Sequence, residues 1–422
     1  MKNRSIFPVR HKMVGGTFIL AMIVLFDRIL ISVAKDPIAS DLSLNDKQMG
    51  WVLSIFALGY ALFQTPSGFL ADKFGARRVL TAVVSLWSFF TALSGAVWSF
   101  GSLMIVRFLF GMGEAGAFPS MARAIFKWIP IKERGIVNGI NFSGGRIGAA
   151  IALPLVAGLI EFTSWRMSFV ILGIIGIVWA VIWYFWFRDS PSEHPGISEK
   201  ELRYIEENVQ QATAGSENEK ISFGKMFKSK TMWLIMGQYF SSNFTFFFCL
   251  TWLFPHLKAT YNLESIEAGF YASAPLIFGA LGNWVSGWMV DFIYKKKRWE
   301  LSRKLPAIIG FSLATIGIIA SIYMNEVTGA VFFISIAVFG ADMTLSPSWS
   351  ACVDIGKEHS GTVSGTMNMA GNLGSFFTAL AFPYLMSITA SATPFFFVAG
   401  TLNLIAIVMW LAIKPQKALK LT

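Results

Sequence analysis

Residues 68–78 read Gly68-Phe-Leu-Ala-Asp72-Lys73-Phe-Gly75-Ala-Arg77-Arg78 and lie between two long apolar segments. A weaker copy, with Gly287 and Asp291 followed by a basic run at 295–298, lies at the corresponding place in the second half of the chain. Both copies place a glycine four residues before an aspartate, with a basic cluster after it. A short polar loop repeated between apolar segments predicts a membrane protein built from two related halves.

The composition is that of an integral membrane protein. Of the 422 residues, 55% are hydrophobic and only 14% are charged, whereas soluble domains average about 25% charged residues. The formal net charge of +11 would suit nucleic acid, but the basic residues follow the membrane pattern instead. Cys249 and Cys352 both fall in apolar segments, and the four histidines are scattered. We therefore expect no disulfide framework, no metal site and no nucleic-acid partner.

Apolar segments long enough to cross a bilayer, which takes roughly 20 residues, occur twelve times. We expect spans at about 14–34, 47–70, 79–98, 102–125, 136–160, 167–187, 231–254, 265–290, 304–323, 328–350, 361–386 and 391–413. The connecting loops are short except for 188–230, which is polar and has an amphipathic stretch near 198–211. The sequence predicts an all-α membrane protein with twelve transmembrane helices in two pseudo-symmetric six-helix halves, 1–187 and 231–422, joined by the central loop.

The basic residues predict the orientation. Most of the 35 Lys and Arg residues fall in segments that share one side of the membrane if the N-terminus is cytoplasmic, which is the positive-inside pattern. We therefore expect both termini and the 188–230 loop to be cytoplasmic. The first apolar stretch contains Asp27-Arg28, so we interpret it as an uncleaved helix and not as a signal peptide. The outer loops lack an Asn-x-Ser/Thr acceptor, and a bacterial inner membrane fits best.

Charged side chains deep in the predicted spans are the first candidates for function. The six are Asp27, Arg28, Arg107, Glu114, Arg146 and Asp342. An ionised residue at the bilayer centre costs about 2.5–3.5 kcal/mol, so such residues must pair, line water or change protonation. They usually mark a substrate or ion path. A purely structural ion-pair network is the alternative for any one of them.

Arg107 and Glu114 lie seven residues apart and share one face of a span. A guanidinium binds a carboxylate through two parallel hydrogen bonds, so Arg107 is the first candidate for binding an anionic substrate and Arg28 the second. The alternative is that Arg107 only pairs with Glu114 or Asp27. Because carboxyl groups can change charge, Asp27 and Glu114 are candidates for taking up protons outside and releasing them inside.

The two halves repeat further motifs in the same order. Glu114-x4-Pro119-Ser120 matches Asp342-x4-Pro347-Ser348, and Asn141-x-x-Gly144 matches Asn368-x-x-Gly371. Transporters built from such repeats place the substrate near the membrane midplane, between the repeats. Arg146 and Asp342 lie on predicted spans from opposite halves, and we predict that they pair as a gate or a stabilising contact.

Polar and amphipathic side chains at membrane depth supply further binding candidates. Tyr60 and Gln64 lie four residues apart on one span and can hydrogen-bond a hydroxyl-rich solute. Trp349 can stack on the face of a sugar, and Asn368 and Asn372 can hydrogen-bond it. Helix packing is the alternative for each of them, because polar side chains often hold membrane helices together.

Essentially the whole chain resembles the major facilitator superfamily. The stretch Gly68-x3-Asp72-Lys73-x-Gly75-x-Arg77-Arg78 is close to the signature between the second and third helices of that family. In the family these residues form a cytoplasmic charge relay that locks the outward-facing state. The resemblance implies a role in conformational switching, and not in substrate binding, for Asp72, Lys73, Arg77, Arg78 and, through the second copy, Asp291.

A narrower resemblance is to the anion:cation symporter family, which contains bacterial hexuronate, glucarate and galactonate importers. The matching stretches are Asp27-Arg28, Phe56-Ala-Leu-Gly-Tyr60-x3-Gln64-x-Pro66-x-Gly68, Arg107-x6-Glu114, Trp165-Arg166 and Asn368-x-x-Gly371-x-x-Gly374. The resemblance implies that Asp27 and Glu114 are the proton-linked acids and that Arg107 holds the substrate carboxylate. It also implies that Tyr60, Trp349 and Asn368 face the sugar acid. Arg146 and Asp342 depart from the pattern of the sugar-acid importers.

We therefore expect a monomeric, proton-coupled importer of a small organic anion, such as a hexuronate or an aldonate, that needs no cofactor besides the proton. One alternative is an exporter of a drug-like or siderophore-like solute, which would have little need of Arg107. Another is a transport-dead sensor that reports a ligand to a partner. We do not expect an enzyme, because the sequence contains no nucleophile–base pair or metal cluster.

Overall fold

The computed structural model describes residues 7–209, 223–263 and 265–417. Within these ranges the chain forms α-helices joined by short turns, and no strand. Two compact units divide the chain. Unit 1 consists of Met1–Ile131, Gly144–Asn218 and Gly356–Met369, and unit 2 consists of Lys132–Ser143, Glu219–Ile355 and Ala370–Thr422. The predicted division at residues 187 and 231 stays a prediction.

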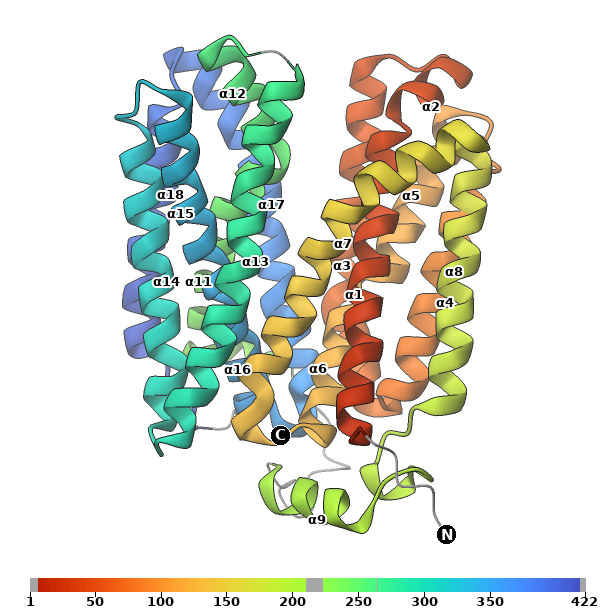
Figure 1. The fold of residues 1–422 in the computed structure, drawn as a ribbon, viewed down its shortest axis with the longest axis vertical. Helices are drawn as coiled ribbons and strands as arrows, with labels where there is room; N and C mark the ends of the chain where they lie inside the picture. Colours follow the sequence, from red (N-terminus) through yellow and green to blue (C-terminus); the bar gives the residue numbers. More distant parts are fainter. Residues whose placement is uncertain (1–6, 210–222, 264, 418–422) are drawn as a thin grey trace. The chain divides into compact units, whose positions relative to one another are not determined.

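Long helices make up most of each unit (Figure 1). Unit 1 contains α1 (Val9–Val33), α2 (Lys35–Asp41), α3 (Asp46–Phe74), α4 (Ala76–Ser94), α5 (Phe100–Glu114), α6 (Ala117–Trp128), α8 (Trp165–Trp186) and α9 (Glu199–Asn208). Unit 2 contains α10 (Phe223–Lys228), α11 (Lys230–Thr251), α12 (Leu253–Tyr261), α13 (Ser265–Lys295), α14 (Trp299–Ser321), α15 (Val327–Met343), nearly all of α16 (Leu345–Gly356) and α18 (Thr393–Ala412). Two helices, α7 (Arg134–Phe162) and α17 (Ser360–Thr389), contribute residues to both units.

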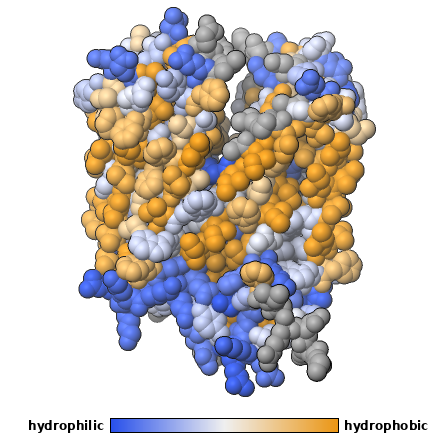
Figure 2. Space-filling model, in the orientation of Figure 1, coloured by the Kyte–Doolittle hydropathy of each residue, from blue (hydrophilic) through white to orange (hydrophobic). Residues whose placement is uncertain are grey.

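A helix or a pair of helices covers every predicted span. In the described part of the chain, nine stretches are long and apolar enough on their own to cross a membrane. One of these stretches, Val327–Thr389, is 63 residues long and takes in α15, α16 and α17. Figure 2 shows apolar residues over the middle of the helices of each unit and hydrophilic residues gathered at their ends.

The fourth and tenth predicted spans each consist of two helices, where we expected one continuous span. Helix α5 ends at Glu114, and α6 begins at Ala117 with Pro119 in its first turn. Helix α15 ends at Met343, and Pro347 lies in the first turn of α16. A proline ring clashes with the carbonyl group four residues earlier and has no N–H to donate, so it breaks a helix just upstream. Each break therefore lies beside the deep acid of the repeated motif.

Residues 68–78, which we predicted to be a polar loop, form a tight helix–helix joint. Gly75 alone separates α3 from α4, with a φ of 85° that residues with a side chain rarely adopt. Asp189, just beyond α8, accepts a hydrogen bond from the Arg77 backbone N–H at 2.9 Å. Burial raises the pKa of the Asp189 carboxyl group. Hydrogen bonds from the backbone N–H groups of Arg77 and Ala76 oppose that rise. A Cβ atom at residue 75 would lie 2.4 Å from Asp189 Oδ2, so only glycine fits.

The amphipathic stretch predicted near 198–211 forms helix α9, which lies across the end of unit 1 where α1 begins (Figure 1). Glu201 of α9 is buried and accepts hydrogen bonds from the backbone N–H groups of Val9 and Arg10, at 2.9 and 3.0 Å. A carboxylate at this position stabilises the start of a helix, because the first N–H groups have no partner within the helix. The central segment thus anchors α1, the helix that carries Asp27 and Arg28.

Candidate functional site

Two acidic side chains in unit 1 each have one paired and one unpaired oxygen. Arg28 Nε donates to Glu114 Oε1 at 2.7 Å, and the Trp87 indole donates to Asp27 Oδ2 at 3.0 Å. Asp27 Oδ1 and Glu114 Oε2 are buried, and neither has a hydrogen-bond partner among the described residues. Each acid therefore keeps an oxygen that can accept a proton or another donor.

Arg107 is buried, and no described residue forms a direct ion pair with it. Its guanidinium lies 4.6 Å from the Phe110 ring centroid and 5.3 Å from that of Phe56. Its side chain is 2% exposed, and the described residues give it no hydrogen bond or ion pair. The alternative of a direct Arg107–Glu114 pair is therefore not what the structure shows, because Glu114 pairs with Arg28. An arginine packed against aromatic rings keeps its charge and its hydrogen-bond donors for another group.

The predicted polar residues of unit 1 gather around Arg28. Its guanidinium lies 4.5 Å from the Tyr60 ring centroid, and Asn368, at the start of α17, lies near the Tyr60 hydroxyl group. Gln64, one turn from Tyr60, is fully buried, and no described residue hydrogen-bonds either atom of its amide. A buried amide without partners is costly, so Gln64 is well placed to hydrogen-bond a solute. Together these side chains offer two cations, two acids and three neutral polar groups.

In unit 2, the predicted aromatic candidate is part of a packed cluster. The Trp349 indole N–H donates to the Tyr239 hydroxyl at 2.9 Å, and its ring lies 5.4 Å from that of Phe142. Trp349 is buried, and its indole N–H already donates to Tyr239, so the structure favours a packing role for this side chain. Asn372 is partly buried in the same unit. Stacking of Trp349 on a sugar stays a prediction.

Asp72, which we expected to act in conformational switching, binds the first turn of α17 within unit 1. Its carboxylate accepts hydrogen bonds from the backbone N–H groups of Gly361 and Thr362 at 2.9 and 2.7 Å, and from the Thr362 hydroxyl at 2.6 Å. The N-terminus of a helix favours a negative charge, because its N–H groups are unpaired and its dipole is positive there. Asp72 therefore fixes the start of α17 against the end of α3.

The second copy of the motif does the same in unit 2. Asp291 of α13 accepts hydrogen bonds from the backbone N–H groups of Gly135 and Ile136 at 2.9 and 2.7 Å, in the first turn of α7. Each copy thus caps a helix that runs through both units. The basic residues behave differently: Arg77 donates to the Tyr184 carbonyl of α8 at 2.8 Å, while Lys73 and Arg78 are exposed. Their role in switching stays a prediction.

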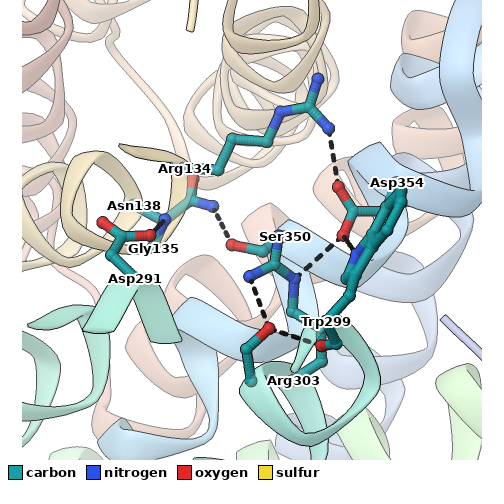
Figure 3. A network of polar contacts seen from close by, with 9 residues as sticks. Arg134, Gly135, Asn138, Asp291, Trp299, Arg303, Ser350 and Asp354 are labelled. Atoms are coloured by element: carbon teal, nitrogen blue, oxygen red, sulfur yellow. Dashed lines mark hydrogen bonds and ion pairs between the residues drawn. The ribbon is translucent and has the colours of Figure 1, made fainter. Parts of the chain in front are cut away.

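A buried ionic network in unit 2 was missed by the sequence analysis (Figure 3). Asp354 accepts hydrogen bonds from Arg134 at 2.6 Å, from Arg303 at 2.9 Å and from the Trp299 indole at 2.9 Å. All three charged side chains are fully buried. Asn138, one turn after Arg134, donates to Ser350 at 3.1 Å. One carboxylate therefore holds together the starts of α7 and α14 and the end of α16.

Arg146 and Asp342 belong to different units, and their predicted pairing stays a prediction. Within unit 2, Asp342 accepts a hydrogen bond from the Asn283 amide at 3.2 Å. Asp342 thus contacts α13 close to the break between α15 and α16.

The sequence model of the Major Facilitator Superfamily matches residues 17–379 of the chain. The chain belongs to the Major Facilitator Superfamily. Members of this superfamily are transporters, so the chain is a multi-pass membrane transport protein and not an enzyme. The resemblance inferred from residues 68–78 is thereby confirmed.

Curated relatives share about a third of the sequence over nearly the whole length. The probable sulfoacetate transporter SauU of Cupriavidus necator is 31% identical over 420 residues, covering 98% of this chain and 96% of the relative. The probable galactarate/D-glucarate transporter GarP of Escherichia coli is 32% identical, covering 93% of this chain and 92% of the relative. The structure of the proton:xylose symporter XylE superposes with a TM-score of 0.77 at 14% identity, covering 98% of both chains, which shows that the fold is shared.

The close packing at the superfamily signature predicts a sharp effect of Gly68→Ala. A Cβ atom at residue 68 would lie 2.2 Å from the Gly361 carbonyl oxygen, so α3 and α17 would have to separate. Overpacking of this kind costs about 1–3 kcal/mol, and we expect the thermal unfolding midpoint of the purified protein to fall by several degrees. Gly101→Ala is the matched control, because a Cβ atom there meets nothing within 4 Å. Equal midpoints for the two variants would contradict this packing.

The network around Asp354 predicts a second effect on stability. Asp354→Asn would leave two buried guanidinium groups without a counter-charge, and breaking a buried pair costs about 3–5 kcal/mol. The control is Asp41→Asn, because the Asp41–Arg166 pair is exposed at the surface and such pairs contribute about 1 kcal/mol or less. Denaturant-free thermal unfolding in detergent measures both variants. Loss of no more stability in Asp354→Asn than in Asp41→Asn would rule out the proposed role of this carboxylate.

The sequence analysis missed these residues because each resembles an ordinary residue of its segment. Arg134, Arg303 and Asp354 fall at the edges of predicted spans, where charges are expected to face water. Trp87 and Phe110 look like ordinary apolar residues of a span. A buried indole N–H needs a hydrogen-bond acceptor. Trp87, in an apolar span, was therefore the one signal in the sequence that a buried acceptor such as Asp27 lies beside it.

Proposed function

We propose that the chain imports a small organic anion of the sugar-acid class together with protons. The observation that carries the proposal is Arg107: a buried guanidinium packed against Phe56 and Phe110 with no ion pair among the described residues. A buried charge without a partner is very costly. An anionic solute that reaches Arg107 supplies the missing counter-charge and binds through two parallel hydrogen bonds.

The Arg28–Glu114 pair supports coupling of this binding to protons. While Glu114 is ionised, it holds Arg28 by a charge-assisted hydrogen bond. Protonation of Glu114 removes the negative charge and releases Arg28, whose guanidinium can then bind a second group of the solute. Asp27, whose unpaired oxygen is also buried, is the second proposed proton carrier. Release inside follows when the acids lose their protons and Glu114 takes Arg28 back.

The substrate class rests on the neutral polar groups beside the two cations. Tyr60, Gln64 and Asn368 suit the hydroxyl groups of a hexuronate or aldonate. The names of the relatives, a sulfoacetate and a galactarate/D-glucarate transporter, point to small anions that carry one or two acidic groups. A solute with two such groups would engage Arg28 and Arg107 at once.

Alternating access is the proposed mechanism of transport, with both termini cytoplasmic and a bacterial inner membrane as the location. Asp72 and Asp291 are the proposed switching residues, because each caps a helix that runs through both units. We propose Arg146 and Asp342 as a charge pair of the same switch. Exchange of the two charges should restore transport that each single substitution removes, and absence of rescue would count against the pair.

A binding screen tests the substrate class. Purified protein is heated with D-glucuronate, D-galactonate, D-glucarate, sulfoacetate and, as neutral controls, the matching sugars. We expect a sugar acid to raise the unfolding midpoint and its neutral analogue to leave it unchanged, because only the acid engages Arg107. Stabilisation by drug-like cations and by none of the acids would favour the exporter alternative.

A further inference from the structure

A basic cavity lies at the end of unit 2 where α13 ends and α14 begins. Figure 1 shows where these two helices meet. Its volume is about 390 Å³. The residues lining it are Lys132, Tyr294, Lys295, Lys297 and Trp299. Three of the five are cations and two are aromatic, and among the described residues no carboxylate lines the cavity. Figure 2 shows hydrophilic residues gathered at this end of the unit.

The carboxylates nearby are committed to other partners. Asp291 accepts two backbone N–H groups of α7, and Glu300 accepts from Lys304 at 2.5 Å. Asp354 binds Trp299, a lining residue, and also two buried arginines (Figure 3). Arg134, Arg303, Asp354 and Asp291 together carry no formal net charge, so the positive charge at the cavity comes from its three lining lysines. The cavity therefore presents a positive field that attracts an anion.

One of the lining lysines, Lys297, has an unfavourable backbone conformation. Lys297 has a φ of 61°, in the left-handed region where glycine is usual. It lies in the short turn 296–298 between α13 and α14. Residues with a side chain in this conformation are found where the surrounding structure or a function requires them.

The outer face of α13 identifies the kind of anion. Trp284, Trp288 and Phe292 are exposed at 45%, 58% and 42% and follow one another at four-residue intervals, so they lie on one face. The same face continues to Lys296, whose Nζ lies 4.3 Å from the Phe292 ring centroid. A membrane-exposed aromatic stripe that ends in a basic turn suits a molecule with apolar chains and an anionic head. A soluble phosphate would contact only the lysines.

We propose that this cavity binds the phosphate group of an anionic phospholipid, with its acyl chains along the Trp284–Trp288–Phe292 face of α13. Lys295 and Lys297 bind the phosphate oxygens, and Tyr294 and Trp299 border the headgroup at the level where aromatic residues are enriched in membranes. This proposal is independent of the transported solute.

Lipid binding by the full-length protein tests the proposal. Delipidated protein in detergent is titrated with cardiolipin, phosphatidylglycerol or phosphatidylcholine, and bound lipid is counted by native mass spectrometry. We expect the anionic lipids to bind more tightly than phosphatidylcholine. The double variant Lys295→Gln/Lys297→Gln should bind cardiolipin roughly 25-fold more weakly, because each lysine near an anionic surface contributes about a fivefold effect. Lys414→Gln/Lys417→Gln, with the same change of charge, should bind like the wild type.

A single substitution distinguishes an effect of lost charge on lipid binding from an effect of lost stability. Lys297→Gly relieves the left-handed backbone and removes one cation, so we expect an unfolding midpoint at least as high as that of the wild type and about fivefold weaker cardiolipin binding. Equal cardiolipin binding by wild type, Lys297→Gly and the cavity double variant would overturn the proposal. So would full displacement of the lipid by inorganic phosphate at a matched phosphate concentration, which would identify a soluble phosphate as the ligand.

Discussion

Replacing Arg107 with alanine is expected to abolish substrate uptake. Removal of one partner of a buried, hydrogen-bonded charge pair costs about 2–5 kcal/mol of binding, which corresponds to roughly a 30- to 4000-fold loss. Because Arg107 has no protein counter-ion among the described residues, its removal should leave folding largely intact. Uptake of a radiolabelled sugar acid into proteoliposomes, at equal amounts of reconstituted protein, measures the effect.

Two further variants sharpen this prediction. Arg107→Lys keeps the charge but loses the planar fork that binds a carboxylate with two hydrogen bonds, so we expect weak uptake with a raised KM. Arg203→Ala, at an exposed arginine of α9, removes the same charge away from the proposed site and should transport normally. Uptake by Arg107→Ala within a fewfold of the wild type would refute the assignment of Arg107 to the anion.

Glu114→Gln is expected to separate binding from proton coupling. Glutamine resembles protonated glutamic acid in size and lacks its charge, so Arg28 is no longer held by an ion pair. We expect substrate exchange across the membrane to persist and accumulation driven by a pH gradient to disappear. One pH unit is worth about 1.4 kcal/mol for each proton, or a tenfold concentration ratio, and the variant should lose that ratio.

The matched control for coupling is Glu161→Gln, because Glu161 is an exposed acid at the end of α7 in the same unit. It should accumulate substrate like the wild type. If Glu114→Gln still concentrates substrate when the outside is made one pH unit more acidic, Glu114 is not a coupling acid. Loss of both exchange and accumulation, with the protein still folded, would instead make Glu114 part of the binding contact.

The sequence predicted the helices well because membrane spans follow from length and hydropathy alone. It also located the deep charges, since an ionised residue in an apolar span stands out. It did not predict which charges pair. Arg107 and Glu114 share a helix face, yet Glu114 binds Arg28 from α1, 86 residues away in sequence. Pairing between helices depends on packing that no single-helix periodicity reveals.

The connections between helices were likewise only partly predictable from the sequence. Residues 68–78 were predicted as a polar loop, but all of them except Gly75 are helical. The reason is Asp189, whose carboxylate accepts the first N–H groups of α4 and lets the chain turn at one glycine. Nothing near residue 75 in the sequence signals a partner so distant. The breaks before Pro119 and Pro347 lie at prolines, which favour a break. Pro66, Pro275 and Pro306, however, lie inside continuous helices, so a proline alone does not predict where a span divides.

The most direct test of the account follows substrate and protons together. Proteoliposomes that contain a trapped pH indicator are given a sugar acid at equal pH on both sides, and uptake and internal pH are recorded at once. We predict that the interior acidifies as substrate enters, and that both signals vanish in Arg107→Ala. Uptake without acidification, or acidification and uptake that survive in Arg107→Ala, would contradict it.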